Sequence, residues 1–259
     1  MYPTLASLGA ENRLSEFRSV TTDGLRLLAF LTIPMLVGLV VLRTEITRTL
    51  FQRGAFDTAD TYLTAYAVGF YGLGLLFFAW RELLNRAFFA LQDTWTPTYI
   101  AVASVAVNIA ANLLLLRYLG HGVLALGASV AAFVATGTLL LLLRKKLGYL
   151  GGQGLLISTA KSGLAAVVMG VVVEVMRRNH VLIRAFGVLS EQTSYFDLGL
   201  LPTAAEVIAL AVIGATIYFA IAHLLRVKEL DQSWRLVRQL AVKALSKTSP
   251  VKPERDFPA

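Results

Sequence analysis

Residues 83–98, LLNRAFFALQDTWTPT, place a polar, proline-containing segment between two of the most apolar runs of the chain. The run before it begins near Tyr62 and continues to about Leu91. As one helix it would be about 45 Å long at 1.5 Å per residue, which exceeds the roughly 30 Å of a bilayer's hydrocarbon core. We therefore expect the last turns of this helix to leave the membrane and the segment to form a cytoplasmic hairpin.

The residues of the hairpin indicate how it is built. Glu82 and Arg86 are four residues apart, so they are expected to pair on one helix face. Thr96 is expected to cap the following helix, with Pro97 at the first helical position. Trp95 suits the aromatic belt at a membrane surface.

The composition of the whole chain supports a membrane protein. Of the 259 residues, 56% are hydrophobic and only 15% are charged, which is too little polar surface for a soluble domain. Helices are expected because only helices and closed barrels satisfy backbone groups in lipid, and no stretch alternates like a barrel strand. The fold predicted from the residues is all-α with six transmembrane helices at about 24–42, 62–80, 97–119, 122–143, 154–176 and 203–225.

Charge sets the predicted orientation. Most of the 24 Lys and Arg residues fall on the side that holds both termini, so the positive-inside rule predicts that both termini are cytoplasmic. The net charge of +8 is interpreted as a topological signal, and no nucleic acid is expected as a partner. Residues 228–259 are predicted to form an amphipathic basic tail against an anionic leaflet, without order beyond about Ser249.

The start of the chain and the division of its length give further expectations. MYPTLAS resembles a helix end that runs into a polar loop, which suggests a piece of a longer parent. We expect four transmembrane helices in residues 1–150, two more in 151–227 and the tail in 228–259.

No constellation of residues points to catalysis. The chain has no cysteine, its three histidines are far apart, and no acid/base set, metal motif or phosphate-binding glycine loop occurs. Gly69, Gly72 and Gly74 are interpreted as close helix packing. Neither an enzyme activity nor a cofactor is expected.

Polar residues within the spans are the candidate functional residues. Arg26 is expected either to snorkel or pair with Asp23, or to contact a phosphate or lipid headgroup. Asn108 and Asn112 lie one turn apart, and either bond a neighbouring helix or line a polar cavity or ion site.

Charged residues of the last two spans and one proline complete the set. Lys161 and Glu206 are expected to snorkel from opposite membrane depths, and Glu174 to pair with Arg177 or Arg178. Pro34 is expected to kink the first span.

Several segments in order resemble the MurJ/MviN lipid II flippases of the multidrug/oligosaccharidyl-lipid/polysaccharide exporter superfamily. They are YPTLAS, GLRLLAFLTIPMLVGLVVL, LFQRGAFDTAD, AYAVGFYGLGL, NRAFFALQDTWTPT and HGVLALGASVAA, between Tyr2 and about Lys146. The last two spans match only in position and hydrophobicity.

The resemblance implies the C-terminal part of a fourteen-helix, two-lobe flippase of the bacterial cytoplasmic (inner) membrane. Its cargo would be lipid II or a similar polyprenyl-pyrophosphate glycolipid, and its other partners membrane lipids and the missing N-terminal lobe of the same protein. The lobes would rock to expose a cavity alternately to each side. Arg26, Asn108 and Asn112 are then cavity candidates, and the last two helices, with Lys161 and Glu206, would form a groove for the lipid tail.

The family also implies a sodium site that this sequence matches only in part. Asn108 matches an Asn ligand, whereas Asn112 stands at an Asp position and Ala128 at a Thr position. We expect no metal, or at most a degenerate sodium site at Asn108 and Asn112. The alternatives to a lipid II flippase are another polyprenyl-linked oligosaccharide or drug exporter of the superfamily, and a non-transporting membrane scaffold.

Overall fold

The computed structural model describes residues 2–119, 122–148, 152–179, 200–227 and 229–230. The helices are α1 (Tyr2–Ala10), α2 (Leu14–Val41), α3 (Arg43–Phe51), α4 (Thr58–Ala90), α5 (Trp95–Leu119), α6 (Val123–Leu147), α7 (Gly152–Arg178) and α9 (Leu200–Leu224). Six of them, α2, α4, α5, α6, α7 and α9, are long and apolar enough to cross a membrane. This confirms the predicted six-span, all-α fold.

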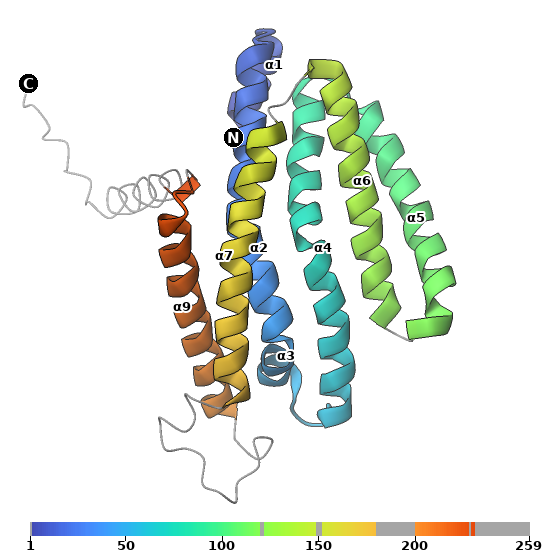
Figure 1. Ribbon diagram of the computed structural model, residues 1–259. Helices are drawn as coiled ribbons and strands as arrows, with labels where there is room; N and C mark the ends of the chain where they lie inside the picture. The colour runs from blue at the N-terminus through green and yellow to red at the C-terminus, as the bar shows by residue number, and fades with distance from the viewer. Residues whose placement is uncertain (1, 120–121, 149–151, 180–199, 228, 231–259) are drawn as a thin grey trace, which may run out of the picture.

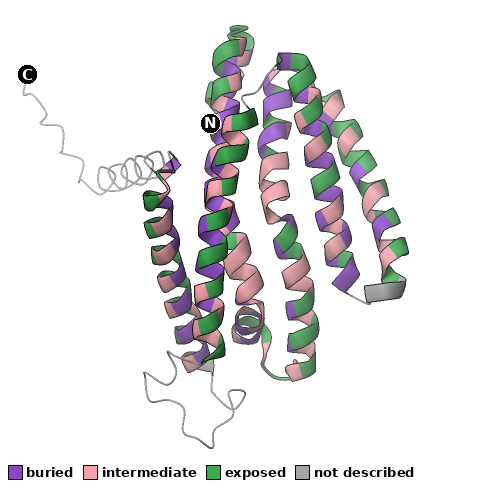
Figure 2. Cartoon of the chain, in the orientation of Figure 1, coloured by how far each residue is buried: buried purple, intermediate pink, exposed green. Residues whose placement is uncertain are grey.

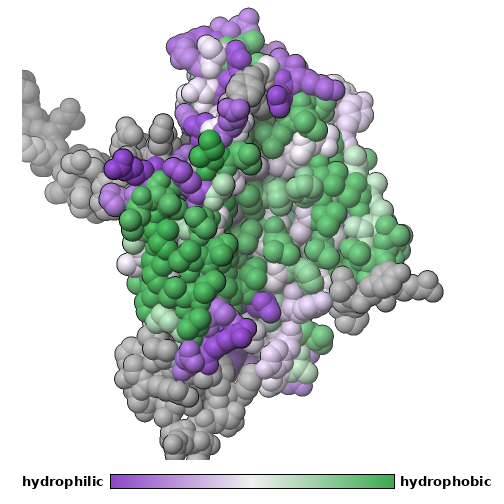
Figure 3. All heavy atoms as spheres, in the orientation of Figure 1, coloured by the Kyte–Doolittle hydropathy of each residue, from purple (hydrophilic) through white to green (hydrophobic). Residues whose placement is uncertain are grey.

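Helix α2 stands at the centre of the bundle (Figure 1). It packs against α4 on one side and α7 on the other; α6 packs on α4, α5 on α6, and α9 on α7. Buried residues follow the facing sides of these helices (Figure 2), while the most apolar window of α5 is fully unburied. An apolar band crosses the visible face of the molecule, and hydrophilic residues gather at the two ends of the bundle, as a bilayer requires (Figure 3).

Small and hydroxyl residues join α4 to α6. Ser129 Oγ donates to the Phe70 carbonyl at 2.8 Å, and Thr136 Oγ1 donates to the Phe77 carbonyl, seven residues further, at 2.9 Å. A β-carbon on Gly74 would lie 2.5 Å from Ser129 Oγ. The prediction that this glycine permits close helix packing is therefore confirmed.

A proline shapes the contact between α2 and α9. Pro34 lies inside α2 and has no N–H, so the Phe30 carbonyl loses the donor that a helix supplies four residues later. The Tyr218 hydroxyl of α9, which is 1% exposed, donates to this carbonyl at 2.7 Å. A side chain from the last span thus satisfies the backbone group that the proline leaves unpaired.

The hairpin at 83–98 forms between α4 and α5 and differs from the expectation in its cap. Glu82 and Arg86 pair at 2.9 Å, as predicted. The expected cap at Thr96 is wrong: Asp93 accepts the Thr96 N–H at 3.0 Å and the Thr96 hydroxyl at 2.8 Å. Since α5 begins at Trp95, Pro97 is its third residue rather than its first.

An ion pair adds to the Asp93 cap. Lys146, at the end of α6, donates to Asp93 Oδ2 at 2.6 Å. The bonds from Lys146 and from the Thr96 backbone lower the pKa of the Asp93 carboxyl to about 2. This carboxylate therefore ties the end of α6 to the α4–α5 hairpin.

The predicted division into 1–150, 151–227 and 228–259 stays a prediction. The predicted amphipathic tail lies outside the described residues, apart from Glu229 and Leu230.

Candidate functional site

An apolar groove of about 400 Å³ lies among the described residues. Helix α2 contributes Pro34 and Gly38 to its lining, and α9 contributes Gly214 and Tyr218. Helix α7 adds Met169, and α3 closes one end with Ile46. The cavity therefore lies where the central helix meets the last two spans.

The groove runs along α2 from mid-helix to the end that adjoins α3. Its lining extends from Phe30 to Leu42, which is about 18 Å at 1.5 Å per residue. Met35 and Phe219 also line it, and they are 62% and 44% exposed. Because these side chains reach the surface of the bundle, the groove opens on that surface.

Aromatic rings form the inner end of the groove. The Phe30 ring lies 5.4 Å from the Tyr218 ring and 6.1 Å from the Phe219 ring, measured between centroids. The Tyr218–Phe30 hydrogen bond lies at the same place. The bond that compensates Pro34 is therefore also part of the groove wall.

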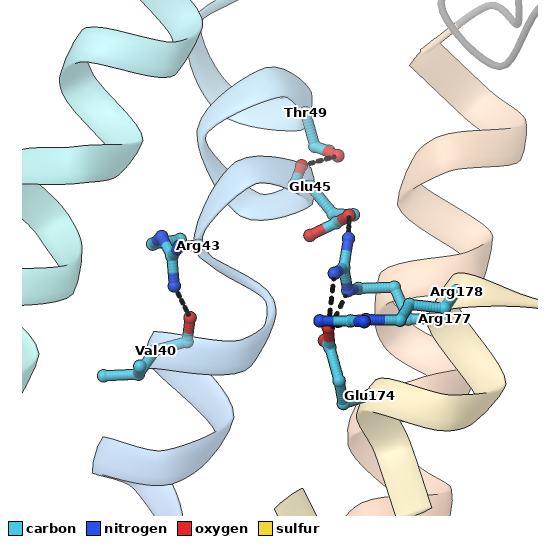
Figure 4. Close-up of polar contacts among 7 residues, drawn as sticks. All are labelled: Val40, Arg43, Glu45, Thr49, Glu174, Arg177 and Arg178. Carbon is cyan, nitrogen blue, oxygen red and sulfur yellow. Dashed lines mark hydrogen bonds and ion pairs between the residues drawn. The ribbon is translucent and has the colours of Figure 1, made fainter. Parts of the chain in front are cut away.

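A network of buried and half-buried charges lies at the α3 end (Figure 4). Arg177 of α7 donates to Glu45 of α3 at 2.9 Å and to Glu174 at 2.8 Å. Arg178 donates to Glu174 at 2.5 Å. The Glu45 side chain is 3% exposed, so its charge is compensated within the protein. The network fastens α3 to α7 beside the groove.

Sequence reasoning found only part of this network. The pairing of Glu174 with Arg177 and Arg178 was predicted and is confirmed. Glu45 was missed because it lies far from Arg177 in sequence. The sequence does place a carboxylate, in RTEITRTLF, directly after an apolar span. That position marks Glu45 as unusual, but it does not indicate which residue pairs with it.

Arg26 does not face the groove. Its Nη1 lies 3.6 Å from Asp23 Oδ1, so the predicted pairing is present. The guanidinium packs so closely on Gly154 of α7 that a β-carbon there would collide with it. Arg26 Nε is shielded from solvent and has no hydrogen-bond acceptor among the described residues.

Asn108 and Asn112 face α6. Asn112 Nδ2 donates to Asn108 Oδ1 at 2.8 Å, and a β-carbon on Gly127 of α6 would collide with Asn112 and lie 3.0 Å from Asn108 Oδ1. Both amides therefore lie at the α5–α6 contact. Within the described residues, no group of three or more His, Asp or Glu is placed to hold a metal ion. A sodium role for the two asparagines stays a prediction.

Lys161 and Glu206 do not line the groove. Lys161 Nζ donates to the Leu225 carbonyl at 3.0 Å, where a cation suits the C-terminal end of α9. Glu206 is 3% exposed, so the expectation that it snorkels is wrong. Depth in the membrane suggested snorkelling, but tertiary packing buries the side chain.

Comparisons with known proteins agree on one family. The family model described as "Lipid II flippase MurJ" matches residues 1–196. A probable lipid II flippase MurJ of Rickettsia prowazekii is 27% identical over 233 residues, which are 90% of this chain and 44% of the relative. One from Rhizobium tropici is 29% identical over 226 residues, 87% of this chain and 40% of the relative. The chain thus spans less than half the length of these relatives.

A solved structure shows the same fold. "Lipid II flippase MurJ, inward closed conformation" matches with a TM-score of 0.61 at 23% identity, covering 83% of this chain and 41% of that chain.

Proposed function

The chain belongs to the lipid II flippase MurJ family, and from this premise we propose that it forms the C-terminal part of a transporter. The cargo is lipid II or a similar polyprenyl-pyrophosphate glycolipid, moved across the bacterial cytoplasmic membrane for cell-wall synthesis. The other lobe is supplied by the part of the relatives that this chain does not match. The observation that carries the proposal is the apolar groove between α2, α7 and α9 in a chain of this family.

The groove suits the lipid tail of the cargo by shape. A tail already dissolved in the bilayer gains little hydrophobic free energy on entering a protein groove, because lipid is equally apolar. What the groove offers is close van der Waals contact along about 18 Å of α2. It therefore holds the tail in a fixed position while the polar headgroup crosses through the rest of the transporter.

The Pro34 region gives α2 a point at which to bend. Alternating access needs helices that change shape around the cargo, and a proline removes one backbone bond at that point. The Tyr218 hydroxyl of α9 binds the carbonyl that this proline leaves without a helical donor. The same tyrosine lines the groove. Binding of the lipid tail in the groove is thereby coupled to the shape of α2.

The proposed orientation puts both termini on the cytoplasmic side. The start of α2 and the ends of α4, α6 and α9 lie at one end of the bundle (Figure 1). Each of these helix ends carries a basic residue, in this order Arg13, Arg86, Lys146 and Arg226. The positive-inside rule expects such residues on the cytoplasmic side. Transport leaves the cargo chemically unchanged, so the protein is not an enzyme.

The test blocks the groove of the complete protein in a bacterium depleted of its own flippase. Gly38 lines the groove, and a β-carbon there meets nothing within 4 Å, so Gly38→Phe fills the groove without a backbone clash. Gly163 of α7 has equal space and does not line the groove, which makes Gly163→Phe the matched control. The measurement is the amount of lipid II at the outer face of the membrane.

We expect the unmodified protein and Gly163→Phe to restore the amount of lipid II at the outer face. Gly38→Phe should lower this amount at least about tenfold, because a cargo that is held out of position reacts or moves more slowly, as misplaced substrates do in enzymes. The lipid II recovered outside should have its original mass. Failure of the unmodified protein to move lipid II refutes the function; full activity of Gly38→Phe refutes the groove's role.

A further inference from the structure

A second cavity, of about 180 Å³, lies between α2, α6 and α7. Its lining combines Thr22 of α2, Leu141 and Arg144 of α6, and Gly152 and Leu155 of α7. It shares no lining residue with the groove. The end of α6 and the start of α7, which form it, lie at the same end of the bundle (Figure 1). In the proposed orientation this is the cytoplasmic end.

Two further arginines lie near this cavity, outside its lining. Arg18 and Arg26 lie four residues before and after Thr22, so all three share one face of α2. Arg26 packs on Gly154 of α7, and Arg18 Nη1 lies 3.6 Å from the position of a β-carbon on Gly148. Arg144 thus lines the cavity itself, while Arg18 and Arg26 approach the end of α6 and the first turn of α7 on either side of it.

The Arg26 side chain has unused hydrogen-bonding capacity. Its contact with Asp23 is 3.6 Å long, beyond the 2.7–3.2 Å of a good hydrogen bond. Its Nε has no acceptor among the described residues although it is shielded from water, and a shielded N–H without an acceptor is destabilising. Together with Arg144 of the cavity lining, this guanidinium suits a phosphate group.

The rest of the lining consists of Leu25, Leu140, Leu141 and Leu155. Leu141 is 63% exposed, so the cavity reaches the apolar surface of the bundle. A soluble anion would leave these leucines without a partner, whereas an acyl chain covers them. The cavity therefore combines a cationic rim with an apolar side, as an amphiphile requires.

We propose that this cavity binds the phosphate group of an anionic membrane phospholipid, with the start of an acyl chain against Leu141 and Leu155. Basic pockets between membrane helices at the cytoplasmic side recognise such headgroups. The cavity has less than half the volume of the groove, about 180 Å³ against about 400 Å³, which suits a phosphate group and the first carbons of an acyl chain. The inference takes its membrane side from the proposed orientation, but it concerns a bilayer lipid and a different cavity, so it does not depend on the proposed transport.

The test measures lipid binding by the complete protein purified in detergent. Phosphatidylglycerol is added, and bound lipid is counted by native mass spectrometry while the melting temperature is followed. Arg26→Gln/Arg144→Gln removes two cations from the rim. Arg81→Gln/Arg86→Gln is the matched control, because it removes two cations near the end of α4, outside the cavity lining.

A cavity-filling variant keeps the test decisive if the arginine variant folds poorly. Gly152 lines the cavity and has open space around its β-position, so Gly152→Leu occupies the acyl position and leaves every charge in place. Inorganic phosphate and phosphatidylcholine are the two further probes: the first tests a free phosphate site, the second a site without headgroup selectivity.

We expect phosphatidylglycerol to bind and to raise the melting temperature. Its affinity should fall about fivefold for each lost cation, about 25-fold for the arginine pair, and clearly for Gly152→Leu. The control should stay within about twofold because distant exposed charges are screened. Unchanged binding by both cavity variants overturns the proposal. So does equal stabilisation by inorganic phosphate, or equal binding of phosphatidylcholine.

Discussion

The two sides of the bundle use the same kind of hydrogen bond for different purposes. Between α4 and α6, Ser129 and Thr136 donate to carbonyls of α4, which regular helix geometry already pairs with N–H groups of α4. Between α9 and α2, Tyr218 donates to the Phe30 carbonyl, which Pro34 deprives of its helical donor. The bonds from Ser129 and Thr136 are additional ones to carbonyls that already have a helical partner. The bond from Tyr218 supplies the partner that the Phe30 carbonyl lacks.

The two sides also differ in what fills the space between helices. Gly74 brings α6 so close to α4 that hydroxyl and backbone touch. The α2–α7–α9 side leaves a groove of about 400 Å³ and relies on the buried charge of Glu45 at its end. The α4–α6 side, called the tight side below, therefore adds close contacts to a complete backbone, whereas on the groove side the Tyr218 bond and the Arg177–Glu45 pair each satisfy a group that would otherwise be buried without a partner.

The largest effect is expected where the groove side depends on a buried charge. Arg177→Met leaves Glu45, 3% exposed, without its cation, which should cost about 3–5 kcal/mol of stability. The measurement is unfolding of the purified protein in mixed micelles. Arg177→Met/Glu45→Gln should recover most of the loss.

An exposed ion pair supplies the control for that variant. Arg13 binds Glu11 and Glu16 with side chains about half exposed, so Arg13→Met should cost no more than about 1 kcal/mol. If Arg177→Met costs as little as Arg13→Met, the buried network does not hold the groove side together.

The next effect concerns the carbonyl freed by proline. Tyr218→Phe keeps the ring and removes the hydroxyl, leaving the Phe30 carbonyl unpaired at a cost of about 1–3 kcal/mol. Pro34→Ala returns an N–H to that carbonyl, so in its background the same change should cost much less. A double-mutant cycle measures this difference, and additive effects would show that the hydroxyl does not compensate the proline.

A smaller effect is expected on the tight side. Thr136→Val removes the hydroxyl that reaches Phe77 while its methyl groups keep the packing. Since that carbonyl keeps its helical partner, the loss should be about 0.6 kcal/mol, the average for such bonds between membrane helices. The same unfolding assay compares it with Tyr218→Phe. A loss as large as that of Tyr218→Phe would remove the distinction between the two sides.

Sequence reasoning predicted the features that depend on composition and short spacing. The six spans followed from apolar length, and the Glu82–Arg86 and Glu174–Arg177 pairs from positions one turn apart. The packing role of Gly74 followed from its small size in an apolar helix.

The groove and its supports could not be predicted in the same way. The bonds from Arg177 to Glu45 and from Tyr218 to Phe30 join residues far apart in the chain, and periodicity carries no information on such pairs. Pro34 indicated a freed carbonyl but not its donor. For Glu206, membrane depth suggested snorkelling, while the packing that buries it is set by other helices.

A further effect lies outside the membrane, at the α4–α5 hairpin of the tight side. Asp93 has its pKa lowered to about 2 by Lys146 and Thr96, against about 3.9 in an unfolded chain. A lowered folded pKa means that the stabilisation is fully present above pH 4 and is lost as the pH falls toward 2. The loss should be about 1 kcal/mol, as for a helix cap with an exposed cation. Stability measured from pH 5 to 2 should show this component in the unmodified protein and not in Asp93→Asn. Its persistence in Asp93→Asn would assign the pH dependence to other carboxylates and leave the hairpin held by packing alone.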